Sequence, residues 1–156
     1  MSIERVRAYF ETLGIAYRIK EFEVSSATVA LAAQALGCEE ARIAKTLSFE
    51  MGDSCILIVC AGDVKIDNSK FKAEFHTKAK MLPFDVVATL CGHAVGGVCP
   101  FAVNEGVKVY LDESLKRFET VFPAAGSGNS AVEMTIDELE KYAKIEKWVD
   151  VCKLIS

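Results

Sequence analysis

Apolar residues recur along the chain with two spacings, one typical of helices and one typical of strands. Near the start of the chain, Ile3, Val6 and Phe10 fall on one face of a helix, and Gly14 follows as a typical helix stop. The same pattern further along predicts short helices separated by short strands. The helices are expected at 2–13, 28–36, 68–75, 84–91 and 136–142, with a last helical turn that includes Trp148, Val149 and Cys152.

Several of these helix ends carry residues that favour caps. Thr28 has a side-chain oxygen that suits an N-cap, and Gly37 suits the left-handed residue that follows a helix. Asn68 is the expected N-cap of the helix at 68–75. Thr135 and Glu138 have the T-x-x-E spacing of a capping box, in which each side chain accepts a hydrogen bond from the other residue's backbone N–H. These residues predict where three of the helices begin.

Runs rich in apolar residues and bounded by turn residues predict the strands. The run from Cys55 to Cys60 is apolar at every position, so we expect it to form a central strand that is covered on both faces. Residues 51–53 (Met-Gly-Asp) suit the connection of a hairpin between this strand and the preceding one. Strands are expected at 16–22, 42–50, 54–61, 98–103, 107–111, 119–124 and 131–134.

These elements predict one compact mixed α/β (α+β) domain over residues 1–156. The chain is 51% hydrophobic and 26% charged, which is ordinary for a soluble globular protein, and no apolar run approaches the length of a membrane helix. No secretory signal pattern precedes the first helix. The six cysteines have no CxxC spacing and read as free thiols in a reducing compartment. We therefore expect a cytoplasmic protein without a membrane partner.

Charge is unevenly distributed along the chain. The net charge of −4 argues against a general nucleic-acid binder, and DNA is not an expected partner. One stretch nevertheless carries five lysines against Asp67 and Glu74, which could steer a polyanion to one face or could be an ordinary solvated surface. The lysines of this basic stretch are Lys65, Lys70, Lys72, Lys78 and Lys80.

Lys45 lies on the unexpected face of its strand. In an extended chain it shares a face with Ile43, Leu47 and Phe49, so a lone ammonium stands in an apolar row. Such a lysine either extends to solvent at a strand end or projects into a cavity toward an anion or a carbonyl group. The strand pattern by itself leaves both interpretations open.

The segment 91–101 is rich in glycine and ends in a shaped turn. Gly96 and Gly97 allow backbone N–H groups to approach a ligand, and Pro100 stiffens the exit, although a simple tight turn explains the same residues. The cysteines and the histidine of this segment lack the paired short spacings that zinc ligands usually show, so we expect no metal. Cys99 with His93 as its base remains open as a nucleophilic pair.

A second small-residue loop at 123–130 follows a predicted strand. It could close a pocket beside the first loop, or it could be an ordinary hairpin connection.

Two motifs in this order resemble the YbaK / prolyl-tRNA-synthetase-associated domain family of aminoacyl-tRNA editing deacylases. Residues 42–47 (Arg-Ile-Ala-Lys-Thr-Leu) are similar to the lysine strand of that family, and residues 96–100 (Gly-Gly-Val-Cys-Pro) match its G-x-x-x-P loop. The order of elements agrees over nearly the whole chain, including residues 109–115 before the late loop. The resemblance implies a barrel-like mixed β-sheet with peripheral helices.

The resemblance also implies hydrolysis of the ester between a wrong small amino acid and its tRNA, such as Cys- or Ala-tRNA(Pro), without a cofactor. Lys45 would be the essential lysine, and backbone amides at Gly96, Gly97 and Val98 would stabilise the oxyanion. The partner would be a misacylated tRNA, with an aminoacyl-tRNA synthetase as a possible second partner, and the basic stretch would bind tRNA. The implied substrate contacts are Thr46, Cys99, Pro100, Phe101, Gly126, Ser127, Gly128 and Asn129.

The late loop departs from the family pattern. Related proteins often carry a basic residue or a histidine there, whereas this chain has Ser127, Gly128 and Asn129, so Asn129 or Ser130 would supply a hydrogen bond instead of a charge. Two other functions therefore stay open. One is a regulatory module that binds a tRNA end or a nucleotide without hydrolysis, and the other is a thiol hydrolase that depends on Cys99.

Overall fold

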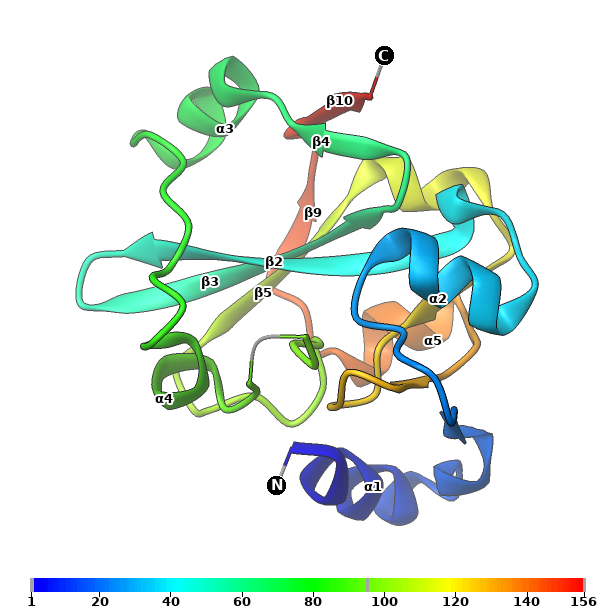
Figure 1. The fold of residues 1–156 in the computed structure, drawn as a ribbon. Coiled ribbons are helices and arrows are strands. Elements are labelled where there is room, and N and C mark those ends of the chain that lie inside the picture. Colours follow the sequence, from blue (N-terminus) through cyan, green and yellow to red (C-terminus); the bar gives the residue numbers. More distant parts are fainter. Residues whose placement is uncertain (1, 95, 156) are drawn as a thin grey trace.

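A long antiparallel hairpin forms the centre of the molecule (Figure 1). The computed structural model describes residues 2–94 and 96–155. Strands β2 (Ile43–Met51) and β3 (Ser54–Ala61) pair antiparallel, with Lys45 opposite Cys60. This confirms the predicted hairpin and its boundaries to within one residue.

The hairpin lies in the middle of a mixed six-stranded sheet. Its order is β8-β6-β2-β3-β5-β9, with parallel pairs at β2–β6, β3–β5 and β5–β9 and antiparallel pairs at β2–β3 and β6–β8. The sheet curls into half of a barrel, which confirms the predicted mixed α+β class. The outer strands are β5 (Lys108–Asp112), β6 (Thr120–Pro123), β8 (Met134–Thr135) and β9 (Lys147–Val149).

Two small antiparallel pairs join distant parts of the chain. Strand β1 (Lys20–Glu21) pairs with β7 (Ser130–Ala131), and this pair ties the N-terminal region to the late loop. Strand β4 (Val64–Ile66) pairs with β10 (Cys152–Leu154). Both pairs bring together segments more than 80 residues apart in sequence.

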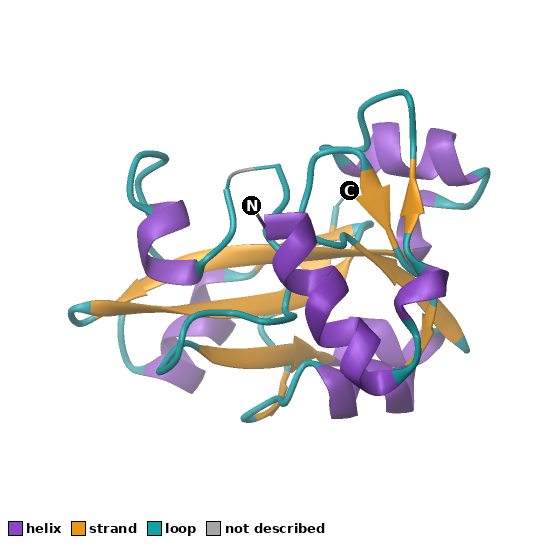
Figure 2. Cartoon of the chain, turned by 90° about the horizontal axis from the view of Figure 1, so that it is seen from below, coloured by secondary structure: helices purple, strands orange, loops and turns teal. Residues whose placement is uncertain are grey.

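The helices lie around the sheet. Figure 1 shows α1 on the opposite side of the molecule from α3 and the β4–β10 pair, and Figure 2, seen from below, shows α1 across the front. The helices are α1 (Ser2–Leu13), α2 (Val29–Leu36), α3 (Asn68–Phe75), α4 (Val87–Cys91) and α5 (Ile136–Tyr142), with 3-10 helices at Ala16–Arg18, Glu40–Arg42 and Glu113–Arg117.

Most of the predicted caps are confirmed. The Thr28 hydroxyl accepts the N–H of the third residue of α2, and Gly37 ends that helix with a left-handed φ of 70°. Thr135 and Glu138 form the capping box of α5. The cap of α3 is one residue earlier than predicted, because the Asp67 carboxylate accepts two N–H groups of the first turn at 3.0 and 3.1 Å.

Two predicted strands in the first two thirds of the chain were wrong in part or in whole. In the segment 16–22, local hydrogen bonds form a 3-10 turn, and only Lys20 and Glu21 reach a partner strand. The segment 98–103 forms no strand. Pro100 has no N–H for a ladder, and Ala102 has a positive φ of 51°, which an extended strand does not allow.

The last third of the chain differs from the prediction in its pairing. The segment 131–134 contributes to two short strands instead of one, because the chain changes its partner from β1 to β6 between β7 and β8. Trp148 and Cys152 lie in strands β9 and β10 and not in a helical turn, because they pair with Leu111 and Ile66.

The core lies on both faces of β3. Leu57, Ile58 and Val59 are completely buried, which confirms the prediction of a doubly covered central strand. On one side, Phe10 of α1 packs edge-on against Phe101, with 4.9 Å between ring centroids. The six cysteines are free and five of them are buried. Within the described residues, no helix has both the length and the apolar character needed to cross a membrane.

Candidate functional site

A cavity of about 360 Å³ opens beside the first half of β2. Its other walls come from the start of α2, the segment before α4, the loop after α4, and β6 with the residues around β7. These segments are far apart in the sequence, and the sheet brings them together. Most of the wall is apolar, with few polar groups, which is the usual composition of a small-molecule site.

Lys45 lines this cavity, and its ammonium group is hydrogen-bonded. The Nζ atom donates a hydrogen bond to the backbone carbonyl of Val64 in β4. An ammonium has three N–H donors, so two remain for a ligand or water. Of the two interpretations left open by the strand pattern, the structure favours the second, because Lys45 lines a cavity and its ammonium group contacts a carbonyl group.

An acidic side chain lies next to this carbonyl. Asp63 forms a two-contact ion pair with Arg117, with distances of 2.6 and 3.0 Å between guanidinium nitrogens and carboxylate oxygens. The hydrogen bond from Arg117 holds the pKa of Asp63 below its ordinary value, and the charge of Lys45 acts in the same direction. Asp63 is therefore ionised near neutral pH and provides negative charge close to the Lys45 ammonium.

Two hydroxyl groups in the cavity wall lack partners. Thr46 Oγ1 and Ser26 Oγ are inaccessible to solvent and make no hydrogen bond within the part of the chain that the structure describes. A buried polar atom without a partner costs about 1–3 kcal/mol, so both hydroxyls lower the stability of the folded chain. Thr46 was among the predicted contacts. Ser26 was missed, because a serine two residues before an N-cap has no distinctive sequence signal.

The loop after α4 contributes backbone to the cavity. Gly96 and Val98 line the wall, and the Val98 N–H has no acceptor among the described residues. The Gly97 N–H is engaged, because it donates to the carbonyl of Ala94 at 3.0 Å. Of the predicted oxyanion donors, Val98 is therefore better placed than Gly97.

The two glycine loops contact each other. A Cβ atom added to Gly97 would lie 2.8 Å from the backbone of Gly126 and Ser127, which is too close for any side chain. In Figure 1 the yellow-green loop after α4 accordingly lies beside the gold late loop. Gly97 thus acts as a contact between loops, and Gly126–Asn129 lie behind the cavity wall instead of lining it.

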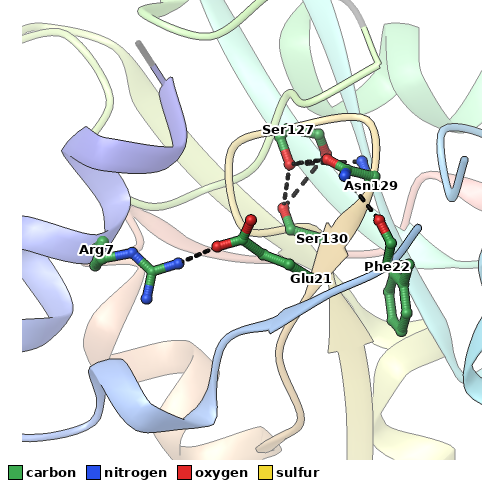
Figure 3. A network of polar contacts seen from close by, with 6 residues as sticks. All are labelled: Arg7, Glu21, Phe22, Ser127, Asn129 and Ser130. Carbon is green, nitrogen blue, oxygen red and sulfur yellow. Dashed lines mark hydrogen bonds and ion pairs between the residues drawn. The ribbon is translucent and has the colours of Figure 1, made fainter. Parts of the chain in front are cut away.

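Hydrogen bonds within the late loop fix its shape (Figure 3). Asn129 Nδ2 donates to the carbonyl of Phe22 at 2.8 Å, and the Phe22 N–H donates to the carbonyl of Asn129 at 2.8 Å. Ser127 Oγ lies 2.9 Å from Asn129 Oδ1 and 2.7 Å from Ser130 Oγ. The Asn129 side chain is therefore occupied in holding the loop, whereas Ser130 lines the cavity.

An ion pair anchors α1 near this loop. Arg7 of α1 contacts the carboxylate of Glu21 in β1, and Figure 3 shows the two side chains pointing toward each other. Because β1 pairs with β7, this contact connects the first helix to the strand that follows the late loop.

Cys99 and Phe101 lie in the core instead of in the cavity. Both are completely buried, and the Cys99 thiol is 3.6 Å from His93 Nε2. Burial raises the pKa of Cys99 to about 12, so the reactive thiolate is scarce at neutral pH. This geometry contradicts a nucleophilic Cys99 and corrects the expectation that Cys99 and Phe101 contact substrate. Pro100 lines a different cavity, together with Tyr9.

The lysines of the basic stretch have different surroundings. Lys70 contacts the carboxylate of Asp150 at 3.0 Å, and Lys80 contacts that of Glu50 at 3.2 Å. The other three, Lys65, Lys72 and Lys78, are exposed and form no ion pair among the described residues. The stretch is therefore partly neutralised.

Comparisons with known proteins give one consistent family. The model of the aminoacyl-tRNA editing domain matches residues 23–142. The uncharacterized protein YwhH of Bacillus subtilis (strain 168) is 51% identical over 154 residues, which is 98% of each chain.

Solved structures agree with this family. A protein provisionally described as a trans-editing enzyme for prolyl-tRNA synthetase has 29% identity and a TM-score of 0.86, with 97% of each chain covered. The hypothetical protein APE2540 has 25% identity and a TM-score of 0.84, with 96% of this chain and 99% of that chain covered. The cavity and both glycine loops lie within the matched residues, and the chain belongs to the aminoacyl-tRNA editing domain family.

Proposed function

We propose that this chain is a trans-editing deacylase, which hydrolyses the ester between a wrongly attached small amino acid and its tRNA. The observation that carries the proposal is that Lys45, Thr46, Gly96 and Val98 line the same cavity in a member of the editing-domain family. The relative described as a trans-editing enzyme for prolyl-tRNA synthetase supports tRNA(Pro) as the tRNA, and the resemblance to the editing deacylases suggests Cys or Ala as the amino acid.

The proposed reaction uses water as the nucleophile. The water oxygen attacks the ester carbonyl carbon, and negative charge develops on the carbonyl oxygen. The tetrahedral intermediate then loses the ribose oxygen, which leaves with a proton, and the free amino acid is released. None of the described residues that line the cavity is His, Asp or Glu. The proton that the attacking water loses would therefore pass through a second water or a hydroxyl group of the substrate to the ribose oxygen that leaves.

Two groups of this chain would stabilise the developing charge. The Val98 N–H, which has no acceptor among the described residues, is a suitable oxyanion donor, since removal of one such donor typically slows acyl transfer by about 10²–10³-fold. Lys45 keeps two N–H donors beyond the one used by Val64, and it would hold the ester or the adjacent phosphate.

Alanines make up part of the cavity wall. Ala32, Ala44, Ala124 and Ala131 line it with short side chains, and the cavity has a volume of about 360 Å³. A pocket of this kind discriminates by size, and each methylene difference is worth about 1–3 kcal/mol. Selectivity against a much larger side chain would therefore be strong, whereas selectivity between Ala and Cys would be modest.

A panel of misacylated tRNAs tests the proposal. We expect the purified protein to release Ala or Cys from tRNA(Pro) faster than it releases a bulky amino acid such as Phe from its own tRNA. The released amino acid is measured against spontaneous hydrolysis. Binding of tRNA without release of any amino acid would contradict the proposal and favour the regulatory module instead.

A further inference from the structure

Two large apolar side chains stand exposed at the rim of the cavity. Phe84 is 79% exposed and Met81 is 57% exposed, yet both line the cavity. Scattered exposed apolar residues are common, but apolar residues gathered at the mouth of a pocket indicate a contact with a ligand or partner. The proposed chemistry gives neither residue a role.

The backbone that carries this rim is held firmly against β2. The Glu50 N–H donates to the carbonyl of Lys80 at 2.8 Å, and the Leu82 N–H donates to that of Ser48 at 3.2 Å. Met81 thereby forms an isolated antiparallel bridge with Phe49 of β2. The exposed rim is thus attached to the strand that carries Lys45, at a fixed distance from the cavity.

The shape of the substrate determines what must pass this rim. An ester bound in a cavity of about 360 Å³ leaves almost all of a tRNA outside, so the single-stranded 3′ end has to leave through the mouth. Aromatic side chains are the usual platforms for unpaired bases, because every base has a face that stacks. On the same segment, Lys78 is exposed and has no ion pair within the described residues, which suits a neighbouring phosphate.

We propose that Phe84 is a stacking platform for an unpaired base at the 3′ end of the RNA, with Met81 packed at the side of that base. The proposal rests on the proposed function for the identity of the ligand. Phe84 is a positioning residue, because it touches the nucleotide chain and not the reacting ester. Its removal should weaken RNA binding and raise KM while it leaves kcat nearly unchanged.

Binding of an RNA hairpin that carries no amino acid and has four unpaired 3′ nucleotides tests this assignment. Fluorescence anisotropy gives Kd for this RNA and for a blunt hairpin of the same stem. We expect Phe84→Ala to weaken binding of the overhang hairpin by about 10-fold, as loss of a stacked base typically does, and to leave the blunt hairpin unaffected. Phe84→Trp should retain the affinity of the wild type.

Tyr17 offers a matched control. Its side chain is 80% exposed, close to the value for Phe84, but it does not line the cavity. Tyr17→Ala should therefore bind both hairpins like the wild type. Equal Kd values for the wild type and Phe84→Ala, or no preference of the wild type for the overhang, would overturn the assignment.

Deacylation by the wild type is scored separately and distinguishes the two proposals. A kcat/KM for deacylation that Phe84→Ala leaves unchanged would leave the deacylase standing and remove the stacking platform. Overhang binding that depends on Phe84, in a protein without turnover, would support the platform and contradict the deacylase.

Discussion

At the scale of single residues, the site depends on a few polar groups in a largely apolar wall. The Lys45 ammonium donates a hydrogen bond to the Val64 carbonyl and lies near the ionised Asp63. Its charge therefore has a defined position before any ligand binds. The hydroxyls of Thr46 and Ser26 are buried and make no hydrogen bond among the described residues, which costs stability. Such preorganised groups reduce the rearrangement needed when charge develops on a substrate.

His93 predicts a pH dependence of stability. Burial lowers its pKa below the ordinary value of about 6.5, so the folded protein resists protonation that the unfolded chain accepts. Its contribution to stability is therefore complete above that value and is lost as the pH falls below it. We expect the free energy of unfolding to decrease between pH 6.5 and pH 5.5, by at most about 1.4 kcal/mol per pH unit. Urea unfolding at each pH measures this decrease as a lower midpoint concentration.

A variant of His93 tests this assignment. His93→Gln should flatten the slope, even where it lowers stability at every pH. The same slope in His93→Gln as in the wild type would show that other groups cause the dependence.

Some residues of the site could be recognised from the sequence and others could not. Lys45 was recognisable because a charge interrupts an apolar row, and that signal survives without any tertiary information. Ser26 was not, because its importance arises only where the start of α2 meets β2. Cys99 was misleading, because a cysteine close to a histidine in the sequence is not always a catalytic pair. Here both side chains are buried and contact the backbone carbonyl of Phe101.

At the scale of elements, the site is built by contacts between two loops. Gly97 lies against Gly126 and Ser127, and the late loop in turn is fixed by Asn129 to the carbonyl of Phe22. The late loop, which has no basic residue, therefore packs against the Gly96–Val98 backbone and holds it at the cavity. Its small residues permit an approach that larger ones would block.

Gly97→Ala tests the loop contact. A methyl group there would meet backbone atoms at 2.8 Å, so the loops must separate and move Gly96 and Val98. We expect a loss of deacylation of at least about 10-fold, with a smaller loss of stability, measured by initial rates and thermal melting. Gly128→Ala is the matched control, because its added methyl meets Ala27 at an ordinary 3.7 Å. Full activity of Gly97→Ala would contradict the loop contact as a determinant of the site.

Element prediction succeeded where local patterns are strong and failed where tertiary pairing decides. The strands β2 and β3 have long apolar runs and a turn between them, so their ends were predictable to within one residue. The end of the strand β9 was not, because the three residues Lys147, Trp148 and Val149 become a strand only by pairing with β5. The segment 98–103 was misread because its apolar residues fill the core from a loop.

At the scale of the whole molecule, the curled sheet brings distant segments to one cavity. Residues of β2, the loop after α4 and the strands near the C-terminal third line the same space, although they are separated by up to about a hundred residues. The fold class and the family were accessible from the order of motifs. The cavity itself was not, because it depends on how strongly the sheet curls.

Charge on the surface should control tRNA binding. Lys72 and Lys78 have no ion pairs among the described residues, so their reversal to Glu should weaken binding and reduce its salt dependence. Lys70 already contacts Asp150, so reversal there should act mainly on stability. Kd for tRNA measured from 50 to 200 mM salt checks this, and an unchanged slope in the double variant Lys72→Glu/Lys78→Glu would remove these lysines from the interface.

The most direct test of the proposed chemistry is deacylation by Lys45→Met. This change keeps an apolar side chain of similar length and removes only the ammonium, so the fold should persist, as checked by circular dichroism and thermal melting. Single-turnover release of Ala from Ala-tRNA(Pro) should fall by about 10²-fold or more, as for loss of a group that stabilises transition-state charge. Release at the wild-type rate from a folded Lys45→Met protein would contradict the role of Lys45 in this cavity.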